Sequence, residues 1–561
     1  IGILYDIIGR QEGCAAERAY LPWVDMAARM RHDGIPLFSL EGCASVAGFD
    51  LLGITLPHEL AATNILEALD LAGIPLHATE RGEGDPLVLG GGPCAFNPEP
   101  VAPFFDAIVV GEGEEVIVEV LDAHKANKAQ GASRATLLRA LAQIEGVYVP
   151  QLYEPDATGR LQPHSPDVPA TVCKRIVKDF ANSPLIARPV VPFAEVSQDR
   201  LVIEVLRGCT RGCRFCQAGM IYRPVRERPA DAIVKAVVQG LACTGFDEVS
   251  LASLSTTDHS QIETILRRLN HTLSATGVGV SIPSQRLDAF GVDMAYLVAG
   301  EKKAGLTFAP EAGTQRLRDI INKNVTEQDL ISAIQHAYQA GWRRCKLYFM
   351  IGLPGETDAD VAGIATLANR AYITAKDAVP EKERGSVRMS ISVAVFVPKA
   401  GTAFQWYGQV ASDEITRRIG VLKAAGLHKG IDFRWHEPKT SLIEGALSRS
   451  GRQAAALIEQ AWLNGARFDA WTEQFRLNAW QEAAAQTGLD LDAMAQRCYE
   501  PDEPLPWEHI STGVDTRYLQ LEWQRALEGA TTDDCSFGSC TACGVCQSLD
   551  AAVVLGGASR G

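Results

Sequence analysis

The stretch RGCTRGCRFCQAGMIYRP, residues 207–224, decides how the rest of the chain is interpreted. It places Cys209, Cys213 and Cys216 within eight residues, in the spacing Cys-x3-Cys-x2-Cys, and contains no acidic residue. The apolar run LVIEVL comes directly before it and is typical of a buried β-strand. With 14 cysteines in 561 residues, chance produces this spacing about 0.01 times per chain, whereas clustered cysteines are typical of metal ligation.

Three thiolates on one loop suit a [4Fe–4S] cluster better than a structural zinc ion. They hold three irons and leave the fourth open to a substrate or cofactor, whereas structural zinc takes four protein ligands. Arg207, Arg211, Arg214 and Arg223 make the loop positive. Positive charge stabilises thiolates and raises the potential of a nearby cluster, although surface arginines are more often solvated or ion-paired. The spacing disfavours three merely structural thiols.

The composition is that of a globular protein with more than one domain. Hydrophobic residues make up 47% and charged residues 22% of a chain too long for one core. A net charge of −15 disfavours a large non-specific nucleic-acid surface. We recognise neither an apolar stretch that spans a membrane nor a secretion leader, and expect a cytoplasmic protein. Because the chain begins with Ile1, we expect one or both natural ends to lie outside it.

Residues 199–410 alternate apolar runs with helical patterns, which is typical of a (β/α) barrel. Six runs predict strands: LVIEVLRGC, DEVSLAS, GVSIPS, GLTFAPE, CKLYFMIG and VRMSISVAVFVP. We therefore expect a partial (β/α)6 barrel. In barrels of this kind the chemistry lies at the carboxyl ends of the strands.

The segments on either side complete an α/β protein. Residues 1–125 predict a Rossmann-like, doubly wound parallel sheet. Because the opening IGILYDII is typical of a helix, we expect the first strand of this sheet to precede Ile1. Residues 126–198 are rich in turn formers and predict a linker with a β-hairpin. Residues 411–530 predict a mainly helical region, and residues 531–550 form a cysteine-rich segment.

The cysteine-rich segment carries a second complete ligand set. Cys535, Cys540, Cys543 and Cys546 follow the spacing Cys-x4-Cys-x2-Cys-x2-Cys. An auxiliary iron–sulfur cluster and a structural zinc ion both satisfy four thiolates. A redox-active disulfide is the main alternative, but disulfides are rare in a reducing cytosol.

Several motifs together resemble the radical S-adenosylmethionine superfamily. They are RGCTRGCRFCQAG, FAPEAGTQRLRDIINKN, KLYFMIGLPGET, LGGGPCAFNPEP and CTACGVC, and the likeness covers nearly the whole chain. The resemblance implies that the first three cysteines bind a [4Fe–4S] cluster whose open iron holds S-adenosylmethionine. One electron, from a donor such as flavodoxin or ferredoxin, then cleaves S-adenosylmethionine to a 5′-deoxyadenosyl radical that abstracts hydrogen from a substrate. The likeness names no substrate. The arginines of the loop suggest RNA or a ribosomal component as one expectation.

The same resemblance implies cofactor contacts at the other strand ends. Many members carry Gly-Gly-Glu after the second strand, whereas this chain has Ser253, Leu254 and Ser255 there. The bare backbone of the GLPGET segment is expected to let adenine approach. The expected S-adenosylmethionine-contact residues are Phe215, Ser253, Ser255, Ser284, Arg286, Glu311, Arg316, Gly352, Pro354 and Gly355.

The N-terminal sheet resembles the cobalamin-binding-like domain that precedes many barrels of this superfamily. Cobalamin binders usually carry Asp-x-His-x-x-Gly after their first strand, and that motif is not present here. Cobalamin is therefore a possible cofactor only, because a fold does not imply its usual ligand. The alternatives are a cobalamin-dependent methyltransferase, a methylthiotransferase-like enzyme and a non-catalytic iron–sulfur sensor. A sensor is disfavoured because it needs no adenosyl pocket.

Overall fold

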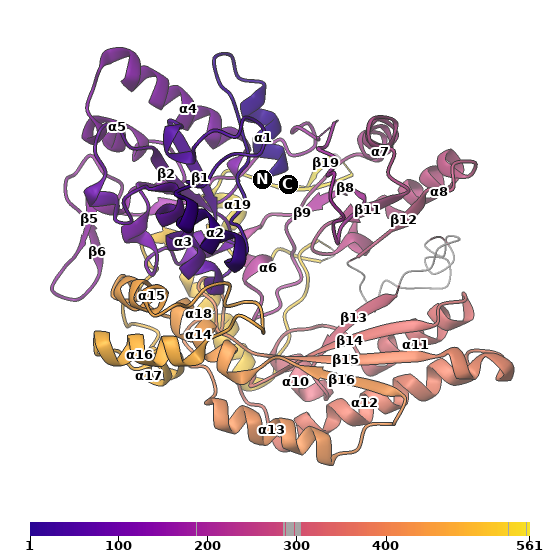
Figure 1. Cartoon of the computed structure of the whole chain (residues 1–561). Coiled ribbons are helices and arrows are strands. Elements are labelled where there is room, and N and C mark those ends of the chain that lie inside the picture. Colours follow the sequence, from indigo (N-terminus) through magenta and orange to yellow (C-terminus); the bar gives the residue numbers. More distant parts are fainter. Residues whose placement is uncertain are drawn as a thin grey trace.

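The computed structural model describes residues 1–561 except Ala187, 284–286, 288–296, 298–304, Phe537, Gly557 and Gly561 (Figure 1). An N-terminal α/β domain lies beside a barrel-like α/β domain, and the C-terminal region contacts both. In the part of the chain that is described, no helix is both long and apolar enough to cross a bilayer.

The N-terminal domain is the doubly wound parallel sheet that the sequence predicts. Its strands run in the order β1 (Leu51–Thr55), β2 (Leu87–Gly91), β3 (Ala107–Val109) and β4 (Val147–Tyr148). The first three are parallel, and β4 is antiparallel to β3. Helices cover both faces: α1 (Gly2–Gly9), α2 (Val24–Asp33), α3 (Ala62–Ala72), α4 (Gly113–Gln130) and α5 (Arg134–Leu141).

Alternate residues of β2 explain why both faces are covered. Val88 packs on the side of α3, whereas Leu87 and Leu89 pack on the side of α4 and α5. A strand with apolar residues on both sides needs a helical layer on each. The opening residues are helical, as the sequence predicts, and form α1.

The barrel domain contains two parallel sheets. One has the order β12 (Gly279–Ser281), β11 (Glu248–Ala252), β8 (Leu201–Glu204), and the other has the order β13 (Leu306–Glu311), β14 (Arg344–Ile351), β15 (Arg388–Val395), β16 (Ile431–Trp435). The six predicted strands are all present. The helices of this domain are α7 (Ala230–Thr244), α8 (Ile262–Leu273), α10 (Gln315–Ile320), α11 (Glu327–Gln339), α12 (Asp358–Asp377) and α13 (Ser412–Ala424).

Strand β16 is a seventh strand that the sequence analysis missed. It pairs in parallel with β15 and lies inside the region predicted to be mainly helical. Its sequence IDFRW alternates apolar and polar residues, which is the period of a half-buried edge strand. A run of five residues between long helical patterns is too short to be recognised as a strand from sequence. Its strand conformation depends on the pairing with β15.

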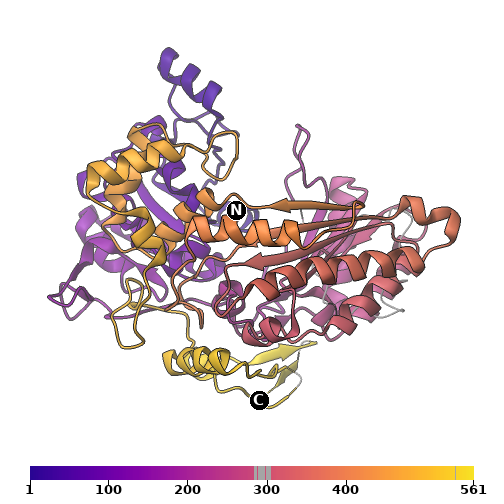
Figure 2. The same cartoon turned by 90° about the horizontal axis from the view of Figure 1, so that it is seen from below.

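The C-terminal helices complete the core of the N-terminal domain. Residues of α15 (Ala454–Leu463) and α16 (Leu477–Thr487) share one apolar cluster with α3. The remaining helices of this region are α14 (Pro438–Ser448), α17 (Leu491–Gln496), α18 (Thr516–Glu528) and α19 (Val545–Ser548). Figure 2 shows the yellow C-terminal segment lying along one edge of the molecule.

Short strands tie the chain ends to the linker and to the barrel. The predicted hairpin consists of β5 (Tyr153–Pro155) and β6 (Leu161–Pro163). β7 (Val172–Cys173) pairs with β17 (Ile510–Ser511). A four-stranded sheet joins β9 (Leu206–Arg207) and β10 (Arg226–Glu227) to the C-terminal strands β18 (Val553–Leu555) and β19 (Ala558–Arg560). The end of the chain therefore pairs with strands that bracket the first cysteine loop.

Candidate functional site

The first cysteine loop connects β9 to the short helix α6 (Gln217–Ile221). Cys216 caps this helix, and its Sγ accepts a hydrogen bond of 3.3 Å from the Gly219 amide. Gly208 has φ +88°, and a Cβ there would lie 2.5 Å from the Pro224 carbonyl oxygen. The loop therefore requires glycine at the point where the chain returns beside its own start.

The three thiols of this loop lie close enough to act on one another. Burial, and then the neighbouring Cys213 thiol, raises the pKa of Cys209 to about 11. Burial, followed by Cys213 and Cys209, raises the pKa of Cys216 to about 12. Protonated thiols at neutral pH become ligands when a metal displaces the proton.

The donor chemistry of the loop fits an iron–sulfur cluster. Cys209, Cys213 and Cys216 supply three sulfur ligands on one loop, as the sequence predicts. Among the described residues, no three His, Cys, Asp or Glu side chains are arranged so that they could hold a metal ion. The three thiols thus supply suitable donor atoms on one loop, but their side chains are not arranged as in a metal site.

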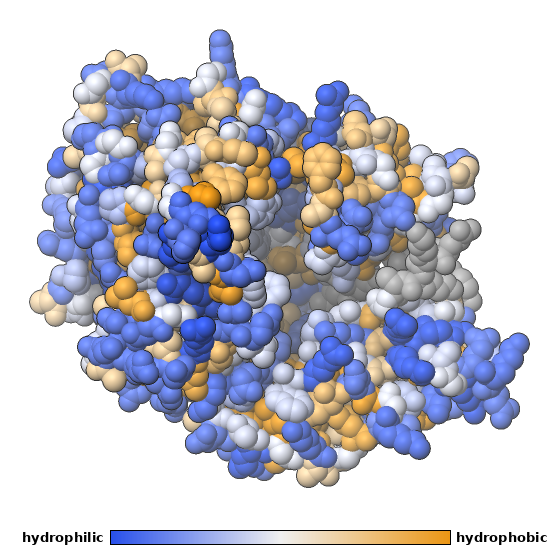
Figure 3. All heavy atoms as spheres, viewed as in Figure 1, coloured by the Kyte–Doolittle hydropathy of each residue, from blue (hydrophilic) through white to orange (hydrophobic). Residues whose placement is uncertain are grey.

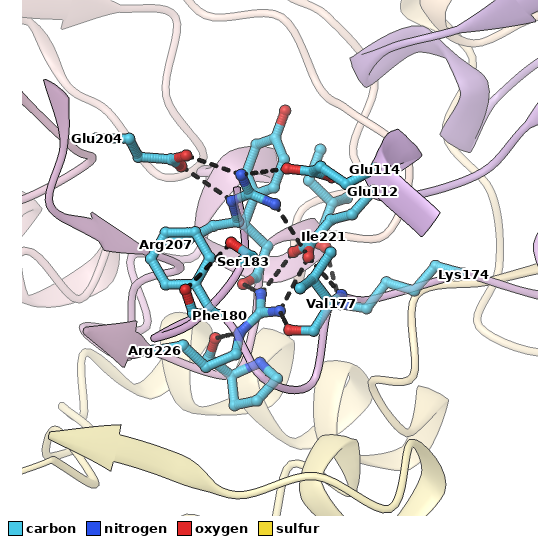
Figure 4. Close-up of polar contacts among 12 residues, drawn as sticks. Glu112, Glu114, Lys174, Val177, Phe180, Ser183, Glu204, Arg207, Ile221 and Arg226 are labelled. Atoms are coloured by element: carbon cyan, nitrogen blue, oxygen red, sulfur yellow. Dashed lines mark hydrogen bonds and ion pairs between the residues drawn. The ribbon is translucent and has the colours of Figure 1, made fainter. Parts of the chain in front are cut away.

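The arginines of the loop are held by acidic partners. Arg207 lies between Glu204, the α4 N-cap residue Glu112 and Glu114 of α4, with contacts of 2.6–3.1 Å (Figure 4). Arg226 donates to Glu112 at 2.5 Å in the same network. These pairs attach the N-terminal domain to the start of the barrel. Their role in tuning a cluster stays a prediction.

Arg211 joins the loop to the end of β11. It pairs with Asp258, which also accepts a hydrogen bond of 2.6 Å from the Ser255 hydroxyl. Ser253 bonds the Thr256 hydroxyl at 2.8 Å. Ser253 and Ser255, both predicted site residues, therefore lie in a polar turn tied to the cysteine loop, and their hydroxyls bond residues of that turn.

The end of β13 carries an unusual backbone conformation. Glu311 has φ +67°, which is rare for a residue other than glycine. Its carboxylate pairs with the Lys323 ammonium at 3.0 Å. Strained residues of this kind cluster at functional sites. Arg316 is half-exposed, pairs with Asp360 and donates to the Gly355 carbonyl at 2.9 Å. Arg316, expected to contact S-adenosylmethionine, is thus paired with a carboxylate of the chain itself.

The GLPGET segment after β14 is a turn built on two glycines. Gly352 has φ +90° and Gly355 has φ +71°. The Gly352 amide donates to the Glu356 carboxylate at 2.7 Å. Leu353, directly before Pro354, belongs to an apolar cluster against which Phe215 of the cysteine loop packs. The structure thus brings Phe215 to the strand ends. Ser284 and Arg286, predicted at the third strand end, lie outside the described residues.

The second cysteine set lies against the first loop. The Ser536 hydroxyl bonds the Thr210 hydroxyl at 2.6 Å, and Arg211 contacts Asp534 at 3.0 Å. Cys543 is buried, and Cys540 and Cys546 are exposed. Burial raises the pKa of Cys535 to about 11 and also raises the pKa of Cys546. About 320 residues of sequence separate the two sets, and no sequence motif predicts their contact.

A second polar group, which the sequence analysis missed, lies where the two α/β domains meet. Lys399 donates to Glu59 at 2.6 Å and to Glu444 at 2.8 Å. Glu59 follows β1, and Lys399 follows β15, so the carboxyl ends of two parallel sheets face this group. On the face drawn in Figure 3 the surface is hollowed between the two domains. The only sequence signal would have been a lysine close after a barrel strand.

The nearby cavity does not fit cobalamin. It has a volume of about 30 Å³ and is lined by residues that include Leu56, His58, Cys94 and Asn97. One buried water needs roughly 10–15 Å³ on this measure, so the cavity has room for about two water molecules. A corrinoid ring is far larger than this cavity.

Two family models match the chain. The one described as "Radical SAM proteins, N-terminal" matches residues 1–150, and the one described as "Radical SAM superfamily" matches residues 203–368. The second match contains the first cysteine loop and the ends of the barrel strands β8, β11, β12, β13 and β14.

The chain is also similar to known proteins and to solved structures. An uncharacterized protein of Methanocaldococcus jannaschii is 30% identical over 436 residues, which are 77% of this chain and 85% of the relative. A protein of Pyrococcus horikoshii, named an uncharacterized methyltransferase, is 23% identical over 58% of this chain and 65% of its own length. A solved structure of the cobalamin-dependent S-adenosylmethionine radical enzyme OxsB has a TM-score of 0.44 and 12% identity, covering 98% of this chain and 80% of that one. Methylornithine synthase, PylB, gives 0.26 and 13%, covering 42% and 70%.

The superfamily model matches the part of the barrel that carries the cysteine loop, and the M. jannaschii relative shares most of its length with this chain. The chain belongs to the radical S-adenosylmethionine superfamily of enzymes.

Proposed function

We propose that Cys209, Cys213 and Cys216 hold a [4Fe–4S] cluster and that the chain cleaves S-adenosylmethionine to start a radical reaction. The observation that carries this proposal is the gathering of three thiols on the loop after β8 and β9, beside the strand ends. When bound and reduced by one electron, the cluster supplies the cleavage of S-adenosylmethionine into methionine and a 5′-deoxyadenosyl radical. A flavodoxin or ferredoxin is the proposed donor of that electron.

The chain's own residues are proposed to bind and orient S-adenosylmethionine. Phe215 packs at the strand ends and shields the loop from water. Glu311 is proposed to accept hydrogen bonds from ribose hydroxyls in place of its contact with Lys323. The backbone of Gly352, Pro354 and Gly355 is proposed to contact adenine. Ser253 and Ser255 are proposed to take over the polar contact that Gly-Gly-Glu makes in other members.

The C-terminal cysteines are proposed to hold a second metal group. Cys535, Cys540, Cys543 and Cys546 supply the four sulfur ligands that zinc or an iron–sulfur cluster requires. The members of this set lie close together: burial contributes most to the raised pKa of Cys546, and the neighbouring Cys543 and Cys540 raise it further. Reduced thiols in this number favour a reducing compartment such as the cytoplasm.

Methyl transfer is the second candidate for the overall reaction. It is favoured by the P. horikoshii relative, which is named a methyltransferase. The small cavity beside Lys399 would not hold cobalamin, and the methyl carrier is left unassigned. Methylthio transfer and an RNA or ribosomal substrate stay predictions, and Arg207 and Arg211, which suggested RNA, are ion-paired.

Anaerobic cleavage of S-adenosylmethionine tests the proposal. Protein reconstituted with iron and sulfide, and reduced with dithionite, should form 5′-deoxyadenosine. Cys213→Ala should form none, whereas Cys243→Ala, at an exposed cysteine in α7, should match the wild type. A wild-type protein that binds four irons at the loop but forms no 5′-deoxyadenosine would favour the sensor alternative.

A further inference from the structure

The C-terminal segment is docked onto the first cysteine loop by buried polar contacts. Asn322 donates to the Gly212 carbonyl at 3.1 Å and accepts from the Thr532 amide at 2.8 Å. Arg214 and Glu522, both fully buried, pair at 3.0 Å. The Thr210–Ser536 hydrogen bond lies between the two cysteine sets. The two cysteine sets therefore lie on either side of a buried polar interface.

Arg223 is the residue that lies between the two sets. Its side chain is 2% exposed. Nε donates to the Gly219 carbonyl at 3.0 Å and Nη2 to the Thr210 carbonyl at 3.4 Å, both beside the first three cysteines. Its guanidinium also lies 5.8 Å from the centre of the Tyr518 ring, on the side of the C-terminal segment.

One nitrogen of Arg223 lacks an ordinary partner. Among the described residues, Nη1 is buried and makes no hydrogen bond to nitrogen or oxygen. Although burial opposes its charge, Tyr518 and the thiols of Cys543 and Cys535 together raise the pKa of Arg223. A buried guanidinium cannot lose its proton and requires an anion. Tyr518 packs in one apolar cluster with Cys543, which places the thiols of the second set on this side of Arg223.

Metal binding would create that anion. A zinc ion with four thiolates, or a [4Fe–4S] cluster with four, has a net negative charge. A [4Fe–4S] cluster on three thiolates is negative as well. Two anionic complexes this close repel each other unless a positive charge lies between them.

Resting on the proposed function, we propose that Arg223 is the shared counter-ion of two metal groups, one on Cys209, Cys213 and Cys216 and one on the C-terminal four cysteines. It stabilises the second group by a direct charge interaction and raises the reduction potential of the first. One side chain would therefore control both metal retention at the second set and the reduction potential of the first cluster.

The test replaces Arg223 and measures both groups without relying on turnover. Arg223→Met removes the charge and keeps much of the length, and Arg223→Lys keeps the charge. Arg228→Met is the matched control, since Arg228 is also buried but bonds Ser183. Iron and zinc are counted per chain before and after a chelator challenge. Cys546→Ser identifies the share held by the second set. A redox titration followed by electron paramagnetic resonance gives the potential of the first cluster.

We expect Arg223→Met to weaken metal retention at the second set by roughly 10- to 100-fold, as removal of a partner beside the ligands does. The same variant should lower the potential of the first cluster. Arg223→Lys should restore both properties in large part, and Arg228→Met should change neither. If Arg223→Met fails to fold, Arg223→Lys compared with Arg223→Gln asks the same question.

Two results overturn this inference and leave the proposed function intact. One is a second set that binds no metal in the wild type while 5′-deoxyadenosine is formed. The other is unchanged metal retention or unchanged potential in Arg223→Met. A first loop that binds no iron overturns the proposed function itself.

Discussion

The two cysteine sets carry the same ligand atoms but are built in opposite ways. The first set is organised locally, by Gly208, by the cap of α6 and by the strand that precedes it. The second has one short helix, α19, and is positioned by contacts with Thr210 and Arg211, more than 300 residues earlier in the chain. A ligand loop can thus be encoded by spacing and turns, or by the surface on which it docks.

This difference predicts unequal consequences when one ligand is removed from each set. Cys216→Ala should reduce 5′-deoxyadenosine formation to background, because it removes a ligand of the cluster that starts the reaction. Cys540→Ala should remove metal from the second set and leave part of the cleavage activity. Iron, zinc and 5′-deoxyadenosine are measured on the same samples. Equal loss of activity in both variants would contradict the distinction between an initiating and an auxiliary set.

The next largest effect concerns the buried ion pair that holds the two regions together. Glu522→Gln leaves the Arg214 charge buried without its partner, and both side chains are 0% exposed. Removing one partner of a buried pair costs about 3–5 kcal/mol of unfolding free energy. Thermal and denaturant unfolding of the full chain measure this cost.

The matched control is a pair on the surface. Glu263→Gln breaks the contact with Arg267 on α8, where both side chains are about 60% exposed. Exposed pairs contribute about 0–1 kcal/mol. A Glu522→Gln variant as stable as Glu263→Gln would show that the C-terminal segment docks without this pair.

The stability of the barrel should depend on pH through one buried carboxyl group, which the docked segment does not contain. Burial raises the pKa of Glu356, after β14, to about 7 from an ordinary 4.5, and its Oε1 has no hydrogen-bond partner among the described residues. Between pH 4.5 and 7 the folded chain keeps a proton that the unfolded chain releases. The unfolding free energy should therefore fall by about 3 kcal/mol as pH rises through this window and then level off.

Glu356→Gln should abolish that fall, because an amide does not titrate. The melting temperature of both proteins, followed from pH 4.5 to 8, measures the difference. The Glu522→Gln variant should keep the fall, since Glu522 lies with the docked segment. A wild-type protein whose stability rises through this window would contradict the raised pKa of Glu356.

The sequence predicted what depends on short-range pattern. The cysteine loop, six barrel strands and the helix at the start of the chain follow from spacing and periodicity. It did not predict β16, whose five residues become a strand by pairing with β15. It also did not predict the Lys399 group or the docking of the second cysteines, because these depend on side chains brought together from distant parts of the chain. Long-range contacts of this kind leave no local signal.

The smallest predicted effect tests the docking contact at a single hydrogen bond. Thr210→Val and Ser536→Ala each remove one hydroxyl of the 2.6 Å bond between the two cysteine regions. A double-mutant cycle should give a coupling of about 1 kcal/mol, because the two hydroxyls bond each other in a buried place. Unfolding of the two single variants and the double variant measures it, and protease cleavage near residue 536 reports release of the segment. Strictly additive losses would mean that the hydroxyls act independently and that other contacts, such as those of Asn322 with Gly212 and Thr532, hold the second cysteine set to the first.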